Sequence, residues 1–316
     1  MSPHRPIATG SYSHDLLVHD GDHDLVEGTR AFVDQGLASG GHVLVHSAPE
    51  RVAMLRTVLG AHPRLEYGLD RDLYLSPMRT LFAYQRKLAE SPASTEFWVT
   101  GTVPLGENPA GHAAWARYES AVNEVLSPYA FHGLCTYDLR ALPPETIAAA
   151  RATHPCVSTG AHRTASPEYQ HPADFLTNPA AGVPGPPDSA PTLSATLRSE
   201  QDLRSARHLV AQSAVASSAV ARHVIDAFVQ AVNEALVNAL QHGGATVHLK
   251  AWAETSRLTC LVTDAGSGIA DPLSGYAYPE AVGPRGLWVA RQLCEGLFIS
   301  NESPAGCRVL LTTAEG

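Results

Sequence analysis

Two residues one helical turn apart carry the first sign of chemistry in this sequence. Between positions 225 and 242, a helical projection of about 100° per residue places Glu234 and Asn238 on one polar side. The opposite side is apolar, with Ile225, Phe228, Val229, Val232, Leu236 and Leu240. A carboxylate and an amide at this spacing supply hard oxygen ligands, which suit a divalent cation. The alternative is that both side chains only form the solvated face of an amphipathic helix.

A second candidate is the glycine-rich end of a β-branched run. Asp264 closes the run and is followed by Gly266 and Gly268, so the backbone can approach a ligand closely there. A third candidate is the glycine-rich helix entry at residues 283–287, where free backbone N–H groups favour phosphate. Each motif alone is ordinary, as a turn or a helix start. Their order within one short stretch predicts a nucleotide site.

The elements around these motifs predict how they are held together. Helices are expected at residues 200–216, 224–242 and 286–294, and strands at residues 193–197, 246–252, 258–263, 297–300 and 307–312. Helices mixed with antiparallel strands favour an α/β sandwich with one helical layer over one sheet.

The first half of the chain has a different pattern. After a loose arm at residues 1–13, helices are expected at residues 24–37, 49–59, 78–90, 110–126 and 143–154. They alternate with strands expected at residues 42–46, 73–75, 97–100 and 133–137. This alternation favours a three-layer, mostly parallel α/β sheet. A Pro/Gly-rich linker at residues 176–192 separates residues 14–175 from a second domain at residues 193–316.

Composition narrows the class of protein. The 316 residues are 44% hydrophobic and 17% charged, which fits globular domains. The net charge of −9 argues against direct nucleic-acid binding, which normally needs a basic face. The sequence shows neither a membrane-length apolar run nor a signal peptide, so we expect a cytoplasmic protein with no membrane contact. Five widely spaced cysteines are typical of reduced thiols.

Residues 200–313 resemble the ATPase domain shared by histidine kinases, gyrase-type topoisomerases and heat-shock chaperones, known as the Bergerat fold. They are most similar to its short anti-sigma-factor kinase branch. The stretch NEALVNALQHG resembles the N box, DAGSG the first glycine box, GPRGLWVARQLCE the second, and Gly306 to Val309 the last Gly-Thr box. The sequence has no Gly-x-x-x-x-Gly-Lys-Ser/Thr motif, so a P-loop site is excluded.

The resemblance implies a role for each matching residue. Asn238 would coordinate Mg²⁺ on the triphosphate of ATP, and Glu234 would orient or deprotonate the attacking hydroxyl or water. Asp264 would accept a hydrogen bond from the adenine amino group. The remaining cofactor-binding residues would be Gly266 and Gly268 along the nucleotide, and Arg285, Gly286 and Leu287 at the phosphate end.

Departures from the family pattern leave the activity open. Pro284 removes a backbone N–H that could meet a phosphate, and Cys307 stands where threonine is common. His208 and His223 lack the surroundings of a phosphoacceptor histidine. The alternatives are therefore a non-catalytic ATP-binding partner-switching module and an atypical sensor histidine kinase.

Residues 12–178 resemble the MEDS sensory domain, a family related in fold to P-loop proteins. The resemblance lies in residues 14–17, 31–37, 42–45, 115–119 and 134–138 and in the helix up to Pro155. The resemblance implies that this domain senses an unknown small molecule. Ser47 to Glu50 cannot form a phosphate loop, so binding of a triphosphate is not expected there. The candidate ligand residues are Glu119, Cys135, Tyr137 and Asp138, near the end of one strand and on one helix, and the favoured alternative is a solvated helix face and a core thiol. A metal site from His154, Cys156 and His162 fits no standard spacing, and solvated histidines are the favoured interpretation.

The two resemblances together predict a signal-responsive regulator. It would bind Mg·ATP and act as an anti-sigma factor, with kinase activity on a serine or threonine of an antagonist protein. Its partners would be a sigma factor and that antagonist. The resemblance also leaves room for a homodimer, since related ATPase domains often pair.

Overall fold

The computed structural model describes residues 12–74, 76–92, 94–105, 109–159, 162–178, 183–244, 246–278, 285–302 and 306–313. The chain folds into two compact units, the first formed by most of residues 12–175 and the second by residues from 176 onward. No described helix is both long enough and apolar enough to cross a membrane.

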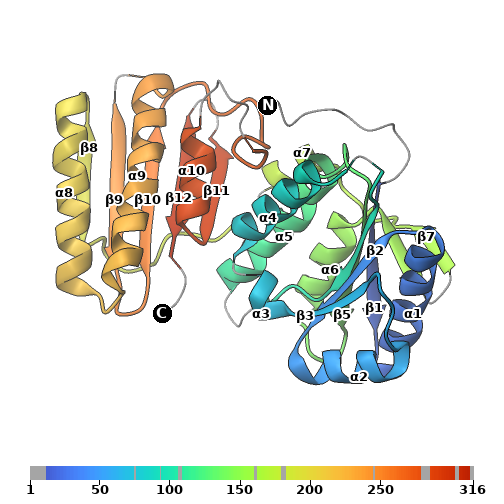
Figure 1. Ribbon diagram of the computed structural model, residues 1–316. Helices are drawn as coiled ribbons and strands as arrows, with labels where there is room; N and C mark the ends of the chain where they lie inside the picture. The colour runs from blue at the N-terminus through green and yellow to red at the C-terminus, as the bar shows by residue number, and fades with distance from the viewer. Residues whose placement is uncertain are drawn as a thin grey trace. The chain divides into compact units, whose positions relative to one another are not determined.

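The first unit is built on a seven-stranded sheet with the order β3-β2-β4-β5-β1-β6-β7 (Figure 1). Its strands are β1 (Tyr12–His19), β2 (His42–Ser47), β3 (Leu65–Leu69), β4 (Phe97–Gly101), β5 (Phe131–Asp138), β6 (Cys156–Thr159) and β7 (His162–Ala165). Neighbouring strands are parallel except for β6 and β7, which form an antiparallel edge. The predicted mostly parallel α/β sheet is therefore confirmed.

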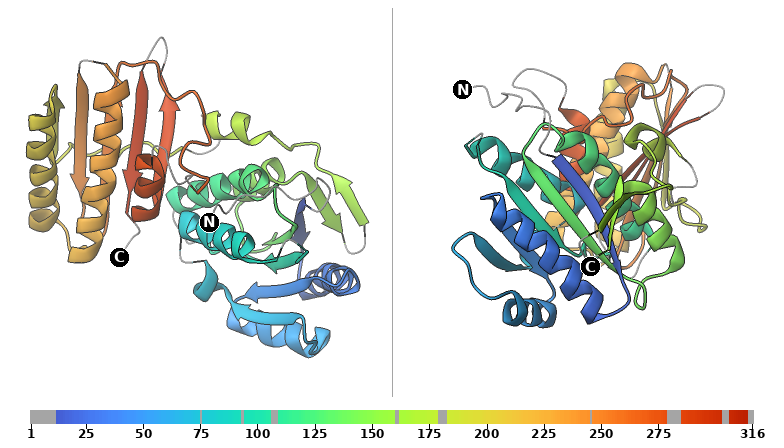
Figure 2. Two further views of the ribbon diagram at one scale, coloured as in Figure 1. Left: turned by 45° about the horizontal axis from the view of Figure 1, so that its top comes forward. Right: turned by 90° about the vertical axis from the view of Figure 1, so that its right-hand side faces the viewer.

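Helices lie on both sides of this sheet, which makes three layers (Figure 2). They are α1 (Asp22–Ala38), α2 (Pro49–Leu59), α3 (Asp70–Leu73), α4 (Pro77–Glu90), α5 (Pro109–Val125), α6 (Pro144–Thr153) and α7 (Pro172–Thr177). On one face, Phe32 and Val33 of α1 pack with Leu17, Trp98 and Leu134 of the sheet. Because side chains alternate along a strand, Gly133, Cys135 and Tyr137 of β5 point to the other face.

Two expectations for this unit are wrong. The predicted arm extends to residue 13, whereas β1 begins at Tyr12 and lies between β5 and β6. The polar pair His14 and Asp15 interrupts the apolar pattern of β1, and only the pairing on both sides shows that it is a central strand. The strand expected at residues 73–75 is also wrong at residues 73 and 74, because α3 ends at Leu73 and the edge strand is Leu65–Leu69; residue 75 lies outside the described residues.

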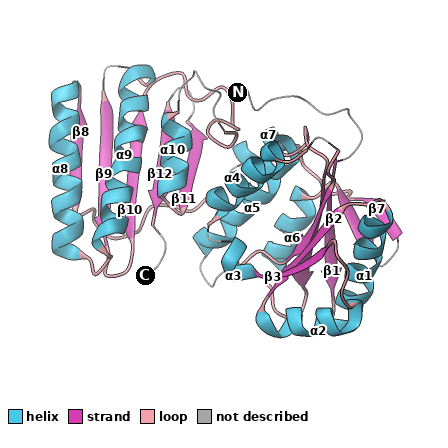
Figure 3. Cartoon of the chain, in the orientation of Figure 1, coloured by secondary structure: helices cyan, strands magenta, loops and turns pink. Residues whose placement is uncertain are grey.

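The second unit is a five-stranded antiparallel sheet with the order β11-β12-β10-β9-β8. Its strands are β8 (Leu193–Leu197), β9 (Val247–Ala253), β10 (Leu258–Asp264), β11 (Gly296–Asn301) and β12 (Cys307–Thr312). Helices α8 (Glu200–Ser217), α9 (Arg222–His242) and α10 (Gly286–Leu293) lie side by side on one face of the sheet (Figure 3). This arrangement is the predicted two-layer α/β sandwich.

The apolar side of α9 forms the centre of the core in the second unit. Phe228, Val232 and Leu236 are at most 1% exposed and belong to one cluster with Leu249 of β9 and Leu311 of β12. Burying this side fixes the rotation of the helix about its axis. The polar side, with Glu234 and Asn238, consequently faces away from the sheet core and toward α10 and the end of β10.

Candidate functional site

A cavity of about 380 Å³ lies in the second unit, within the range of about 300–1,000 Å³ that is usual for small-ligand sites. Its walls come from the C-terminal half of α9, the end of β10, the segment after it, the start of α10 and the start of β12. The lining residues are Ala235, Asn238, Ala239, His242, Gly243, Asp264, Gly268, Ile269, Ser274, Gly275, Gly286, Leu287, Trp288, Cys307 and Val309.

Asp264 is held rigidly at the edge of this cavity. It is the last residue of β10 and pairs with Val247 on one side and Cys307 on the other. Its Oδ1 accepts a hydrogen bond of 2.9 Å from the backbone N–H of Gly266, which orients the carboxylate. A ligand amino group can then donate to Oδ2. A half-buried carboxylate held in this way is suited to recognising a donor on a nucleobase.

Two glycines let the end of α9 lie close to the end of β10. A Cβ on Gly243 would collide with the side chain of Asp264, and a Cβ on Gly266 would lie 2.6 Å from the carbonyl oxygen of His242. The Gly-Gly end of α9 and the glycine motif after β10 are therefore in direct contact. Gly266 shapes the wall from behind and is not among the residues that line the cavity.

Glu234 and Asn238 occupy different parts of the site. Asn238 lines the cavity, whereas Glu234 lies one turn back, against the start of α10. A Cβ on Gly286 would lie 3.0 Å from Glu234 Oε2, so a larger residue there would displace the carboxylate by a few tenths of an ångström. The chain thus places an amide and a carboxylate in sequence along one side of α9, both next to the N-terminus of α10.

The N-terminus of α10 presents backbone donors to the cavity. The helix starts at Gly286, and the side chain of its N-cap residue, Arg285, does not cap it. Gly286, Leu287 and Trp288 all line the cavity, and the first N–H groups of a helix have no intrahelical acceptor. This end can therefore bind an anion such as phosphate. Arg285 is exposed beside it, and Gly283 and Pro284 lie outside the described residues.

The segment after β10 is held by two residues to which the sequence motifs assigned no role. Asn301 Oδ1 accepts from the N–H of Ile269 at 2.8 Å, and its Nδ2 donates to the Ile269 carbonyl at 3.0 Å. The buried Arg291 of α10 donates to the carbonyl of Ser274 at 3.2 Å and stacks over Tyr276 at 3.9 Å. These contacts hold the segment over the cavity. Asn301 lies outside every glycine motif, and Arg291 lies in the stretch that resembles the second glycine box but has no role assigned there, so only the fold connects them to the site.

The structure thus gathers most of the nucleotide-site residues expected from the sequence. Asn238, Asp264, Gly268, Gly286 and Leu287 line one cavity. Gly266 and Glu234 lie directly behind its wall, and Arg285 is at its edge. His242, Gly243, Gly275 and Trp288 also line it and were not singled out as ligands. Of these four, only Gly243 belongs to the Gly-Gly pair that ends the helix and could have been found from it.

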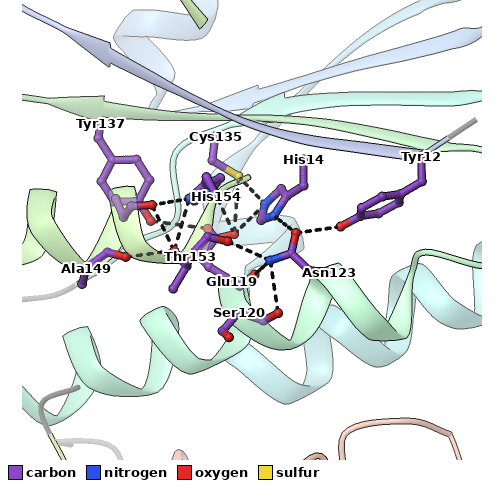
Figure 4. A network of polar contacts seen from close by, with 11 residues as sticks. Tyr12, His14, Glu119, Ser120, Asn123, Cys135, Tyr137, Ala149, Thr153 and His154 are labelled. Carbon is purple, nitrogen blue, oxygen red and sulfur yellow. Dashed lines mark hydrogen bonds and ion pairs between the residues drawn. The ribbon is translucent and has the colours of Figure 1, made fainter. Parts of the chain in front are cut away.

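In the first unit, three of the four candidate sensory residues come together. Glu119 of α5 lies beside Cys135 and Tyr137 of β5, with Sγ of Cys135 at 3.5 Å and the Tyr137 hydroxyl at 3.5 Å from its carboxylate (Figure 4). His14 of β1 and His154 after α6 complete this cluster, with Nε2 atoms 3.0 Å and 3.7 Å from Glu119 Oε2. Neither histidine was expected there.

The fourth candidate, Asp138, belongs to a different set of contacts. It lies on the opposite face of β5, where it accepts from Arg51 at 2.6 Å and from Arg140. Burial alone would raise the pKa of Asp138, but the bonds from Arg140 outweigh it and hold that pKa below its ordinary value. Asp138 is therefore a paired carboxylate, separate from the Glu119 cluster.

The interpretation of the histidines needs correction as well. His154 is 0% exposed and packs against His14, with ring centroids 4.2 Å apart, so these two are not solvated. Burial lowers the pKa of His154 to about 3, which keeps this imidazole neutral. The set of His154, Cys156 and His162 does not form, since Cys156 and His162 lie at opposite ends of the β6–β7 hairpin.

Two family models match these two units. The model described as the MEthanogen/methylotroph, DcmR Sensory domain (MEDS) matches residues 13–155, and that of the histidine kinase-like ATPase domain matches residues 195–313. The chain joins a MEDS domain to a histidine kinase-like ATPase domain. The comparison with curated proteins finds no match for this chain. The cavity described above lies in the ATPase domain, and the Glu119 cluster lies in the MEDS domain.

Proposed function

We propose that the chain is a signal-responsive regulator whose ATPase domain binds Mg·ATP and acts on a sigma-factor pathway. In this proposal it is an anti-sigma factor that phosphorylates a serine or threonine of an antagonist protein. The observation that carries the proposal is the meeting of Asn238, Asp264 and the N-terminal end of α10 in one cavity. These three groups suit, in turn, a metal-bound triphosphate, a base amino group and a phosphate.

The cavity supports the placing of ATP in one orientation. Asp264 would accept from the adenine amino group, and the N–H groups at Gly286 and Leu287 would face the phosphates. Asn238 lies between these ends, so its amide oxygen would hold Mg²⁺, which often uses one or two protein oxygens plus phosphate. The ion would supply charge neutralisation on the triphosphate.

Glu234 is the residue that makes catalysis part of the proposal. Its carboxylate lies against Gly286, at the end of the site that we assign to the phosphates. A carboxylate there can orient an attacking hydroxyl and accept its proton. Transfer of the phosphoryl group to a protein hydroxyl requires mainly that the reactants are positioned and their charge is neutralised.

A non-catalytic module is the second candidate, and Cys307 favours it. This thiol is 5% exposed and lines the cavity beside Asp264, at a position where the kinase branch commonly has a threonine hydroxyl. ATP would then only shape a surface for a partner. A histidine kinase is the third, although His208 and His223 are exposed on helices that pack on the ATPase sheet itself.

Labelled ATP separates these functions. The full chain is incubated with γ-labelled ATP, Mg²⁺ and a candidate antagonist protein. Samples of the products are then treated with acid or with base to test the stability of the label. An acid-stable, base-labile label on the antagonist supports the kinase. Binding in calorimetry without any transfer supports the non-catalytic module, and an acid-labile label on this chain supports the histidine kinase. Absence of ATP binding would refute all three.

A further inference from the structure

The cluster around Glu119 brings four metal-binding groups to one point inside the MEDS domain. These groups are His14 Nε2, Glu119 Oε2, Cys135 Sγ and His154 Nε2, all within 4.8 Å of one another (Figure 4). His14, Glu119 and His154 are at most 2% exposed. They come from β1, α5, β5 and the end of α6, and no sequence motif connects them.

Hydrogen bonds outside the cluster fix which ring nitrogens face inward. The amide nitrogen of Asn123 donates to the carbonyl of Thr153 at 2.7 Å, so its oxygen faces Nδ1 of His14 at 3.1 Å. That oxygen can only accept, which places a hydrogen on His14 Nδ1. His154 Nδ1 likewise lies 2.7 Å from the carbonyl oxygen of Ala150, which also can only accept.

Both imidazoles therefore turn Nε2 toward the carboxylate and the thiol. A proton between His14 and Glu119 would satisfy that pair as an ion pair. That proton would do nothing for Nε2 of His154. This atom is fully buried and has no hydrogen-bond partner among the described residues. A buried polar atom without a partner is costly, so this arrangement calls for a cation that all four groups share. Ligand histidines that donate their other N–H to a carbonyl or amide oxygen are usual at metal sites.

Four of the six distances between the ligand atoms lie near the edges of a tetrahedral site. A tetrahedron with metal–ligand bonds of about 2.0–2.3 Å has edges of about 3.3–3.8 Å. Glu119 Oε2 lies 3.0 Å from His14 Nε2, 3.7 Å from His154 Nε2 and 3.5 Å from Cys135 Sγ, and the thiol lies 3.4 Å from His14 Nε2. A cavity of about 20 Å³, the space of one water molecule, adjoins His14, Glu119 and Cys135.

Gly133 supports this geometry from the neighbouring strand. It pairs with His14 in the β1–β5 register, and a Cβ there would lie 3.1 Å from Cδ2 of the His14 ring. A side chain at this position would press on the imidazole that Asn123 orients.

We propose that His14, Glu119, Cys135 and His154 form a four-coordinate site for a divalent transition metal ion. Two imidazoles, one carboxylate and one thiolate make a mixed donor set that suits Zn²⁺ best among common ions. The hard oxygen-seeking ions Mg²⁺ and Ca²⁺ are not expected to bind it. The site lies in the sensory domain and does not depend on the nucleotide site.

The test uses the full chain, without an affinity tag or nucleotide. The protein is stripped with a chelator, dialysed against Zn²⁺ or Co²⁺, and its metal is measured by elemental mass spectrometry. We expect about one ion per chain, with proton release as thiol and imidazole become ligands. The Co²⁺ form should show the strong visible absorption of four-coordinate cobalt and a sulfur-to-metal charge-transfer band.

Matched variants assign the ligands. Cys135→Ser should remove the charge-transfer band and weaken Zn²⁺ binding at least tenfold, and circular dichroism reports whether it folds. Cys156→Ser and His162→Ala, from the adjacent hairpin, should bind like the parent protein. A parent protein that retains almost no ion, or binds Co²⁺ with the weak spectrum of a six-coordinate ion, would overturn the proposal whatever the variants do. A band unchanged in Cys135→Ser would do so too.

Discussion

Gly243 lies directly against the side chain of Asp264, and no Cβ fits between them. This contact joins the end of α9, which carries Asn238, to the end of β10, which carries the carboxylate. The N–H of Gly266 donates a hydrogen bond to the same carboxylate. The position of Asp264 in the cavity therefore depends on a glycine that comes before β9 in the chain, whereas Asp264 ends β10.

Gly243→Ala should weaken ATP binding at least tenfold, or about 1.4 kcal/mol. The backbone angles of Gly243, φ −91° and ψ 5°, are open to alanine, so the effect comes from collisions of the added Cβ with the side chain of Asp264 and with the carbonyl oxygen of Ala239. Calorimetry on the full chain measures it. Gly244→Asn is the control: Gly244 has φ +88°, which asparagine tolerates, and open space around its Cα. Equal affinity of Gly243→Ala and the parent protein would show that Asp264 does not bind the nucleotide.

Asp264→Asn should lower the affinity for ATP by about one to two orders of magnitude, because a hydrogen bond to a charged group contributes about 1.5–3 kcal/mol. The amide can still accept from Gly266, so the fold is kept. Asp271→Asn is a matched control, since Asp271 Oδ1 accepts from the N–H of Leu273 at 2.9 Å in a similar turn. It should bind ATP normally, and the reverse ranking of the two variants would contradict the assignment.

Glu234→Gln should leave ATP affinity nearly unchanged and reduce phosphate transfer at least about 100-fold, the usual contribution of a general base. The amide keeps the size and position of the side chain but cannot take a proton. Transfer of labelled phosphate to the antagonist protein gives the rate. Asp226→Asn, on the exposed side of the same helix beside Arg222, should transfer at the parent rate. Unchanged transfer in Glu234→Gln would remove this residue from catalysis.

Alkylation of Cys307 should report occupancy of the cavity. Burial, with Asp264 adding to it, raises the pKa of this thiol to about 11. Only the thiolate reacts, so the rate should be low at neutral pH and rise about tenfold per pH unit until the pH nears that pKa. The alkylation rate is measured by peptide mass spectrometry after treatment with a maleimide. ATP should protect Cys307 and leave Cys156 of the MEDS domain unaffected; equal labelling with and without ATP would place the nucleotide elsewhere.

Most of the ATPase domain could be predicted from the sequence because its signals are local. The helix of Glu234 and Asn238 is set by a period of about 3.6 residues, and the strand before Asp264 by β-branched residues. The helix start at Gly286 and the strand Cys307–Thr312 agree with expectation for the same reason. Local patterns do not record which backbone presses on which side chain. The contacts of Gly243, Asn301 and Arg291 therefore appear only in the fold.

In the MEDS domain, tertiary structure decided more of the site than the sequence did. Its alternating helices and strands determine a mostly parallel sheet, but β1 is central only because β5 and β6 pair with it on both sides. His14 and Cys135 are far apart in the chain, and the β1–β5 register places them on one face, under Glu119 of α5 and His154 after α6. No period in the sequence encodes such a meeting, since it depends on strand order and register. The sequence by itself thus determined the fold class and the order of the nucleotide motifs, and tertiary pairing alone decided that two histidines, a carboxylate and a thiol converge.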